Sequence, residues 1–132
     1  MACFLVPLSF GLVLFFVRKK FPAWLHVDWF LAMVFGGSFV LGVEHFVNGE
    51  IVPFFPFLSA LKSAEETNVM LNEMLFVGFP MFFVVLIVWL FLVFVYKYFL
   101  AKSSCFSLRF FGYIPLMFLG AFLMFFVDYL LA

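Results

Sequence analysis

Four apolar segments, separated by polar connections, set the pattern of this chain. A helix needs roughly 20 apolar residues to cross a hydrocarbon core about 30 Å thick, and each segment approaches that length. Read with their polar extensions, they predict helices over residues 2–17, 28–47, 64–98 and 109–131. The pattern therefore predicts an all-α, polytopic integral membrane protein with four transmembrane helices in a single domain, 1–132.

Composition supports this reading. The 132 residues are 69% hydrophobic and 11% charged, and their mean hydropathy is +1.31. A water-soluble domain of this size still exposes a large share of its surface, so it could not bury so much apolar material. We therefore expect the lipid bilayer to be the main partner of the chain.

The longest connection contains an apolar stretch that does not look like a span. Residues 50–61 read EIVPFFPFLSAL, in which Pro53 and Pro56 each lack a backbone donor and disfavour helix at the preceding residue. Irregular backbone is tolerated inside a membrane only where protein or water satisfies its polar groups. This stretch is therefore predicted to lie at the outer interface or to fold back over the helix ends.

A short amphipathic helix is predicted directly after this stretch. Ser63 and Glu66 have the spacing of a capping box, in which an N-cap hydroxyl and a carboxylate close the first turn. Apolar residues then recur at helical spacing, so the helix should continue into the third span. Pro80 removes one backbone hydrogen bond, which predicts a kink near Gly78.

The basic residues predict the orientation in a cell membrane. The three connections carry three, one and three Lys or Arg, and the side with the excess is normally cytoplasmic. Basic loops 18–27 and 97–109 are therefore predicted to be cytoplasmic, with both termini outside. Six of the seven acidic residues then fall on the outer side, and only Asp28 on the inner side. The zero formal net charge gives no basic face for nucleic acid.

Small residues mark the surfaces where the predicted helices should pack together. Lipid tails are as apolar as leucine, so helices in a bilayer associate through close backbone approach. The second predicted helix and the fourth carry such residues, namely Ala32, Gly36, Gly37, Ser38, Gly42, Gly112 and Gly120. The second helix is therefore expected to be central. The third carries bulky residues on every face and is expected to be the most lipid-exposed.

A cluster of polar residues is predicted at the outer ends of three helices. Glu44 and His45 end the second helix, Glu73 begins the third span, and Asp128 lies one turn from the end of the fourth. Carboxylates near a membrane are costly unless they are paired, hydrated or bound to a cation. These four residues are candidate metal ligands, and a divalent cation is the one cofactor that the sequence suggests. A proton relay through His45, or simple solvation of helix ends, would also account for them.

The remaining polar residues suggest little chemistry of their own. Cys3 and Cys105 are predicted on opposite faces of the membrane and so form no disulfide, and no metalloprotease, nucleophile-elbow or phosphate-loop motif occurs. His26 and Asp28, at the inner end of the second helix, suggest an interfacial cap in preference to a second part of a permeation path.

These observations favour a non-enzymatic membrane component. It would be a channel-like or transporter-like homo-oligomer, or an accessory subunit of a larger membrane complex, with an outward-facing acidic and histidine cluster that binds a cation. The span centres carry no charge, which argues against an ion-coupled transporter with a midplane site. The alternative is a metal-dependent membrane enzyme acting on a lipid or other interfacial substrate, with residues 50–61 as a lid.

Overall fold

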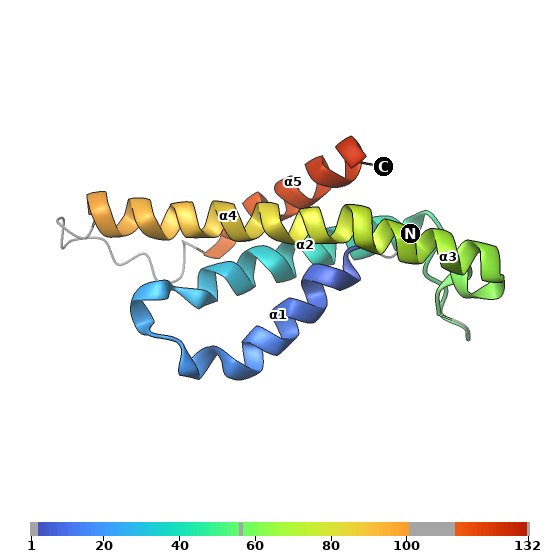
Figure 1. Ribbon diagram of the computed structural model, residues 1–132, viewed down its shortest axis with the longest axis horizontal. Helices are drawn as coiled ribbons and strands as arrows, with labels where there is room; N and C mark the ends of the chain where they lie inside the picture. The colour runs from blue at the N-terminus through green and yellow to red at the C-terminus, as the bar shows by residue number, and fades with distance from the viewer. Residues whose placement is uncertain (1–2, 56, 101–112, 132) are drawn as a thin grey trace.

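The computed structural model describes residues 3–55, 57–100 and 113–131. These residues form an all-helical fold, in which the one β-type pairing is an isolated bridge between Ile51 and Leu58. Three helices are long and apolar enough to cross a membrane: Val27–Val47, Ala64–Tyr98 and Tyr113–Leu131. The expectation of an all-α fold is thus confirmed for the described residues, and three of the four expected spans have a helix of sufficient length and apolarity (Figure 1).

The first helix, α1 (Leu5–Val17), is shorter than the sequence suggests. Its 13 residues extend for only about 20 Å at the usual helical rise. Arg18–Lys20 follow as a 3-10 turn, and Pro22 is in extended backbone. Figure 1 shows α1 running obliquely to the long helices, with the chain entering it near the junction of α3 and α4.

The central helix is α2 (Val27–Val47), as predicted. Half of its most apolar window is buried, the largest share among the three spans. Its closest neighbour is α5 (Tyr113–Leu131), and glycines make this approach possible. A Cβ at Gly36 would lie 2.8 Å from the backbone of Met117, and one at Gly120 would collide with the backbone of Met33.

One long helical rod contains α3 (Ala64–Glu73), a π-helical turn (Met74–Gly78) and α4 (Phe79–Val95), followed by a second π-helical turn (Tyr96–Leu100). The predicted cap is present, since the backbone N–H of Glu66 donates to the Ser63 hydroxyl at 3.1 Å. The first π-helical turn ends just before Pro80, whose missing N–H would have interrupted an α-helical ladder.

The fourth predicted helix appears as α5, and it is the least buried of the three spans. Buried residues make up 22% of its most apolar window, against 33% for the rod of α3 and α4. The expectation that the third predicted helix is the most exposed was therefore wrong. The proposed start of this helix at residue 109, and the packing role of Gly112, lie outside the described residues.

The connection between α2 and α3 is irregular, as its prolines predict. Val52 donates its backbone N–H to the carbonyl of Phe57 at 2.9 Å, which folds the stretch into a narrow loop. Phe54 and Phe55 at the turn are strongly exposed, while Ile51 packs against the core. The loop therefore presents an apolar tip beside the helix ends.

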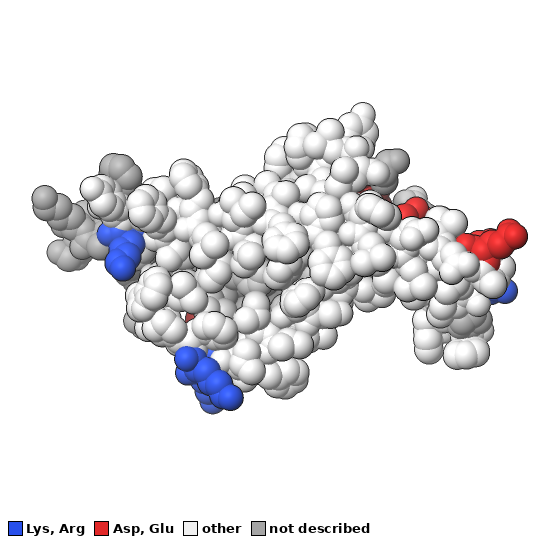
Figure 2. Space-filling model, in the orientation of Figure 1, with Lys and Arg blue, Asp and Glu red and all other residues white. Residues whose placement is uncertain are grey.

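Charge separates along the longest dimension of the molecule (Figure 2). We call one extremity the basic end and define it by Arg18, Lys19 and Lys20, which follow α1, and Lys97, which follows α4. The opposite extremity, the acidic end, carries one basic residue, Lys62, just before α3, and six acidic residues: Glu44, Glu50, Glu65, Glu66, Glu73 and Asp128. On the face shown, the surface between the two ends has no Lys, Arg, Asp or Glu, and large apolar side chains of α2, α4 and α5 are exposed, among them Phe39, Phe91 and Phe122. This distribution suits a protein whose middle lies in hydrocarbon.

Candidate functional site

A cavity of about 220 Å³ lies at the acidic end, between the N-terminal residues, α2, the α3–α4 rod and α5. All four candidate ligands from the sequence line it. The complete lining is Cys3, Glu44, His45, Asn48, Glu50, Glu73, Val77 and Asp128. The cavity thus brings together side chains that are up to 125 positions apart in the sequence, as expected if the helix ends lie at a common level.

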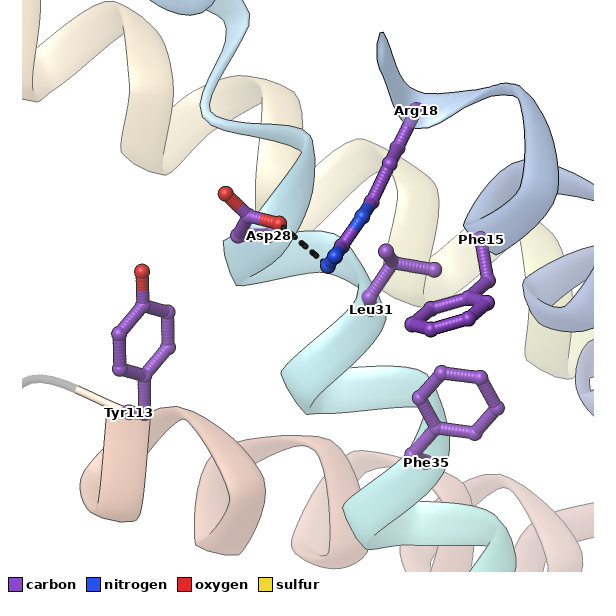
Figure 3. A pocket seen from close by; sticks show the side chains of 6 residues that line it. All are labelled: Phe15, Arg18, Asp28, Leu31, Phe35 and Tyr113. Carbon is purple, nitrogen blue, oxygen red and sulfur yellow. Dashed lines mark hydrogen bonds and ion pairs between the residues drawn. The ribbon is translucent and has the colours of Figure 1, made fainter.

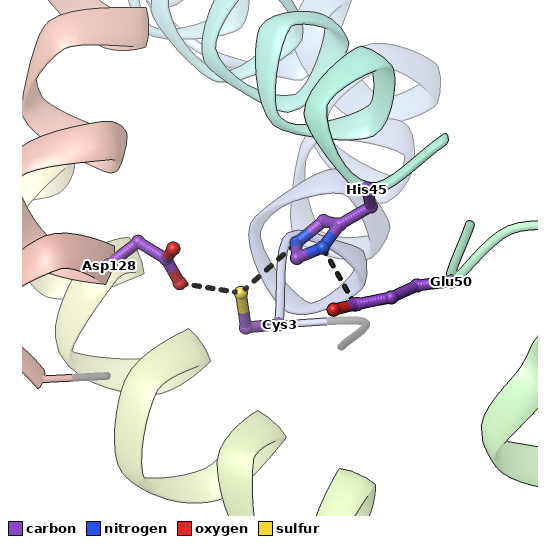
Figure 4. A network of polar contacts seen from close by, with 4 residues as sticks. All are labelled: Cys3, His45, Glu50 and Asp128. Atoms are coloured by element: carbon purple, nitrogen blue, oxygen red, sulfur yellow. Dashed lines mark hydrogen bonds and ion pairs between the residues drawn. The ribbon is translucent and has the colours of Figure 1, made fainter. Parts of the chain in front are cut away.

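His45 is the best-anchored side chain in this cavity. It is 5% exposed, and its ring stacks on Phe4 with the centroids 5.5 Å apart. Its Nδ1 lies 2.9 Å from a carboxylate oxygen of Glu50, and its Nε2 lies 3.8 Å from the Cys3 sulfur (Figure 4). Both ring nitrogens are therefore directed at named partners.

The end of α2 explains why Glu50 returns to His45. Gly49 has a φ of +75°, the left-handed conformation that glycine adopts without steric cost. The turn lets the backbone N–H of Glu50 donate to the carbonyl of His45 at 3.0 Å. The turn thereby places the Glu50 carboxylate beside the imidazole of His45, five residues earlier in the chain. Burial tends to raise the pKa of Glu50, but the net direction is downward, and the charge and hydrogen bond of His45 contribute to this lowering.

Cys3 joins the histidine to the C-terminal helix. Its thiol donates to an oxygen of Asp128 at 3.3 Å, and the sulfur is almost fully buried (Figure 4). Burial, followed by the charge and hydrogen bond of Asp128, raises the pKa of this thiol to about 12. Gly78 makes room for this arrangement, because a Cβ there would lie 2.8 Å from the Cys3 carbonyl oxygen.

Glu44 lines the cavity and has one side-chain oxygen that is buried. Among the residues that the structure describes, no hydrogen bond reaches its Oε2, although this atom is shielded from solvent. An unsatisfied buried acceptor is costly, and a charged one more so. Glu44 is thus the carboxylate in this cavity that most needs a ligand or an ordered water.

The four predicted ligands share the cavity, but they do not form a compact metal centre. Within residues 3–55, 57–100 and 113–131, no group of three or more His, Cys, Asp and Glu side chains is close enough to hold one metal ion directly. Four carboxylates nevertheless face a space with one imidazole. The arrangement suits a positively charged occupant that reaches most of these groups through water.

Sequence reasoning did not identify Cys3, Asn48 and Glu50 as part of this site. Glu50 and Asn48 belong to the same polar stretch as Glu44 and His45, and the Asn-Gly pair at 48–49 is a recognisable helix-ending signal. Cys3 had a weaker signal. Its predicted position on the outer side places it at the level of the cluster, but nothing in the sequence shows which way it points.

The inner candidates, His26 and Asp28, lie at the start of α2. His26 caps the start of α2 in a left-handed conformation, with a φ of 46° and no side-chain cap hydrogen bond. Its ring stacks on Trp29, and its carbonyl accepts from the Trp89 indole at 3.2 Å. Asp28 pairs with Arg18 at 3.4 Å. His26 thus occupies the N-cap position of α2, although its side chain makes no cap hydrogen bond.

No known protein family matches this sequence, and neither a curated protein nor a solved structure is significantly similar to it. The chemistry of the acidic cavity is therefore the basis on which a function is proposed.

Proposed function

We propose that this chain is a non-enzymatic membrane component that binds a cation in the cavity at its acidic end. One observation carries the proposal. Glu44, Glu50, Glu73 and Asp128 line a single space of about 220 Å³, together with one imidazole and one amide. All four are half-buried, and like charges that share one space repel each other unless a positive charge compensates them. The buried Glu44 Oε2, which has no hydrogen-bond partner among the described residues, supports this requirement.

The size of the cavity favours a cation that keeps part of its water shell. One water occupies about 30 Å³ in the liquid, so the space holds several waters around an ion. Mg²⁺ commonly binds in this way, through one or two carboxylates and several retained waters, because it dehydrates reluctantly. A divalent cation of this type does not need three protein ligands in direct contact. We therefore propose Mg²⁺, or Mn²⁺ in its place, as the occupant.

The membrane arrangement belongs to the same proposal. The basic end faces the cytoplasm, so the cavity opens to the outside and the termini lie on that side. The short α1 crosses as a tilted fourth span, with local thinning of the bilayer around it. The exposed apolar sides of α4 and α5 then face lipid, a second copy of the chain or another membrane subunit.

The metal-dependent enzyme gains no specific support from the cavity. Cys3, His45 and Asp128 are far apart in the sequence but contact one another in the structure. The raised pKa of the Cys3 thiol nevertheless keeps it protonated near neutral pH, and a protonated thiol is a poor nucleophile. The exposed tip of the loop at Phe54 and Phe55 gives no indication that residues 50–61 cover the cavity as a lid.

Manganese binding tests the proposal directly. Protein purified in detergent would be titrated with Mn²⁺, and free Mn²⁺ would be measured by electron paramagnetic resonance, with Mg²⁺ as a competitor. Glu44→Gln and Asp128→Asn should each weaken binding by about tenfold or more, equivalent to about 1.4 kcal/mol, because each removes a charge from the cavity wall. Glu65→Gln is the matched control, since this exposed residue at the start of α3 lies outside the cavity.

The binding curves decide between support and contradiction of the cation proposal. Saturable binding at one site, competed by Mg²⁺ and weakened only by the two cavity variants, would support it. Absence of saturable binding to the wild type, or equal weakening by Glu65→Gln, would contradict it, because the acidic cavity would then have no special affinity.

A further inference from the structure

A second cavity, of about 420 Å³, lies at the opposite, basic end of the molecule between α1, α2 and α5. Figure 3 shows its six lining residues: Phe15, Arg18, Asp28, Leu31, Phe35 and Tyr113. We propose that this cavity binds a phospholipid with a primary ammonium headgroup. The phosphate would contact Arg18, the ammonium would contact Asp28, and the upper acyl chain would lie along the apolar wall.

From the rim of the cavity inward, polar side chains are followed by apolar ones, as a lipid headgroup is followed by its acyl chains. Asp28 lies in the first turn of α2, at the rim, and Arg18 directly follows α1. Phe35 lies seven residues beyond Asp28 on α2, which is about 10 Å farther along the helix axis. Polar groups therefore occupy the headgroup level, and aromatic and aliphatic groups occupy the level of the acyl chains. The volume is within the range of about 300–1,000 Å³ that ligand sites usually have.

Arg18 is held in place but retains donors for a phosphate. Its guanidinium lies over the ring of Phe15, 4.6 Å from the centroid, and one of its nitrogens lies 3.4 Å from Asp28. A guanidinium has five N–H donors in a planar fork that suits phosphate oxygens. The side chain thus lies at the rim, with most of its donors not used by Asp28.

The pairing with Asp28 does not prevent binding. The side chains of Arg18 and Asp28 are 43% and 58% exposed, and ion pairs that are so exposed contribute little to stability. A headgroup can therefore share or replace this contact at small cost. The negative phosphate of the headgroup would face the positive Arg18, and its positive ammonium would face the negative Asp28.

Asp28 also provides discrimination between headgroups. A lipid that is only anionic would place its charge next to this carboxylate and be repelled. A quaternary ammonium has no N–H to donate to Asp28, whereas a primary ammonium has three donors. Tyr113, on the first turn of α5, faces the same cavity from the other side and supplies a hydroxyl (Figure 3). The site should therefore favour phosphatidylethanolamine over phosphatidylcholine and phosphatidylglycerol.

Native mass spectrometry tests this preference. The protein would be released from micelles that contain equal amounts of the three lipids, and the ratio of lipid adducts would be read within one spectrum. This ratio does not depend on how much protein is folded, so a destabilised variant remains informative. The wild type should retain phosphatidylethanolamine at least threefold more than either other lipid.

Two variants separate the roles of the charges. Arg18→Gln should lower the retention of all three lipids, because each of them loses the partner of its phosphate, and should leave the excess of phosphatidylethanolamine in place. Asp28→Asn should abolish the discrimination against phosphatidylglycerol. Lys19→Gln, which removes a neighbouring exposed charge but does not line the cavity, should leave the ratio unchanged.

Several outcomes would overturn the proposal. One is equal retention of the three lipids by the wild type, another is an unchanged ratio in Asp28→Asn, and a third is undiminished retention of all three lipids by Arg18→Gln. Soluble glycerophosphoethanolamine provides a further arm. If it competed as well as the lipid at equal concentration, the site would recognise a free headgroup, and the acyl-chain part of the proposal would be wrong. None of these results depends on the cation proposed for the acidic end.

Discussion

Cys3 lies between two groups that would affect its thiol in opposite ways. An adjacent imidazolium lowers the pKa of a thiol, whereas an adjacent carboxylate raises it. The structure favours the second effect, since the thiol donates to Asp128 at 3.3 Å and is buried. Cys3 therefore acts as a hydrogen-bond donor that connects the N-terminal residues to α5. The contact to His45 Nε2, at 3.8 Å, is longer.

The first prediction concerns this thiol. In a Cys105→Ser background, Cys3 should be alkylated slowly at pH 8, because the pKa of about 12 leaves almost no thiolate. Asp128→Asn removes a negative charge, so the pKa of Cys3 should fall, and alkylation should begin at a lower pH. Burial should still hold this pKa above its ordinary value of 9.0. The measurement is the alkylation rate as a function of pH.

A matched charge change controls for general electrostatics. Glu65→Gln, on the exposed start of α3, should leave the pH profile unchanged. An identical profile in Asp128→Asn would mean that the carboxylate does not influence the thiol, and the contact between them would lose its proposed role.

The composition of the candidate site could be predicted only in part. Glu44, Glu73 and Asp128 were identifiable because hydropathy alone places helix ends, and an even alternation of spans brings these ends to one level. The contribution of Glu50 depends on the left-handed turn at Gly49. The position of Cys3 depends on the packing of α1 against Gly78. Such tertiary details have no periodic signal in the sequence.

At the scale of elements, α2 and α5 form the tightest pair of helices. Gly37 faces Gly120 across this contact, since a Cβ on Gly37 would lie 2.9 Å from the Gly120 carbonyl oxygen. Not all predicted packing residues take part. Gly42 instead faces Phe4 at an ordinary 3.8 Å, and Ala32 is only partly buried. Gly36, Gly37 and Gly120 therefore form a seam, the contact line between α2 and α5. Because these glycines pack within the chain, they are not available for contacts between copies.

The second prediction tests this seam. Gly120→Ala should destabilise the fold by about 1–3 kcal/mol, the usual cost of overpacking, because the new Cβ would collide with the backbone of Met33. Gly42→Ala should have little effect, since the nearest atoms are 3.8 Å from its Cβ position and belong to a side chain. Unfolding in a series of detergent and SDS mixtures would compare both variants with the wild type. Equal stability of the two variants would contradict the close approach of α2 and α5.

The sequence predicts the existence of helices better than their surroundings. Hydropathy identified α2 because its apolar run has the length of a span. The capping residue Ser63 identified the start of α3. Hydropathy overestimated α1, whose helix begins only at Leu5. It also misjudged how much of α4 is buried within the chain, because bulky side chains on all faces of α4 do not reveal that one face is covered. Val85, Trp89 and Val93 form that buried face.

At the scale of the whole molecule, the two ends differ in charge and in the ligands we propose for them. The basic end has a cavity with one balanced ion pair, and the acidic end has a cavity with four carboxylates. Between them lies an apolar surface that water would solvate poorly. The sequence predicted this separation through the distribution of Lys and Arg. It could not show that α1 reaches from one end toward the other despite its 13 residues.

The third prediction concerns this orientation. In a Cys3→Ser, Cys105→Ser background, single cysteines would be introduced by Lys19→Cys, Lys97→Cys, Glu65→Cys and Ala2→Cys. A membrane-impermeant maleimide on intact cells should label Glu65→Cys and Ala2→Cys, because the acidic end and the N-terminus are proposed to face outward. Lys19→Cys and Lys97→Cys should react only after permeabilisation, since a basic end is retained in the cytoplasm.

The pattern of labelling distinguishes the components of the arrangement. Protection of Ala2→Cys together with Lys19→Cys would mean that α1 does not cross the membrane, leaving three spans while the acidic cavity still faces outward. Labelling of Lys97→Cys in intact cells, with protection of Glu65→Cys, would reverse the whole molecule and place the proposed cation site in the cytoplasm. In that case the proposed lipid site would face the outer leaflet, and its headgroup preference would have to match the lipids there.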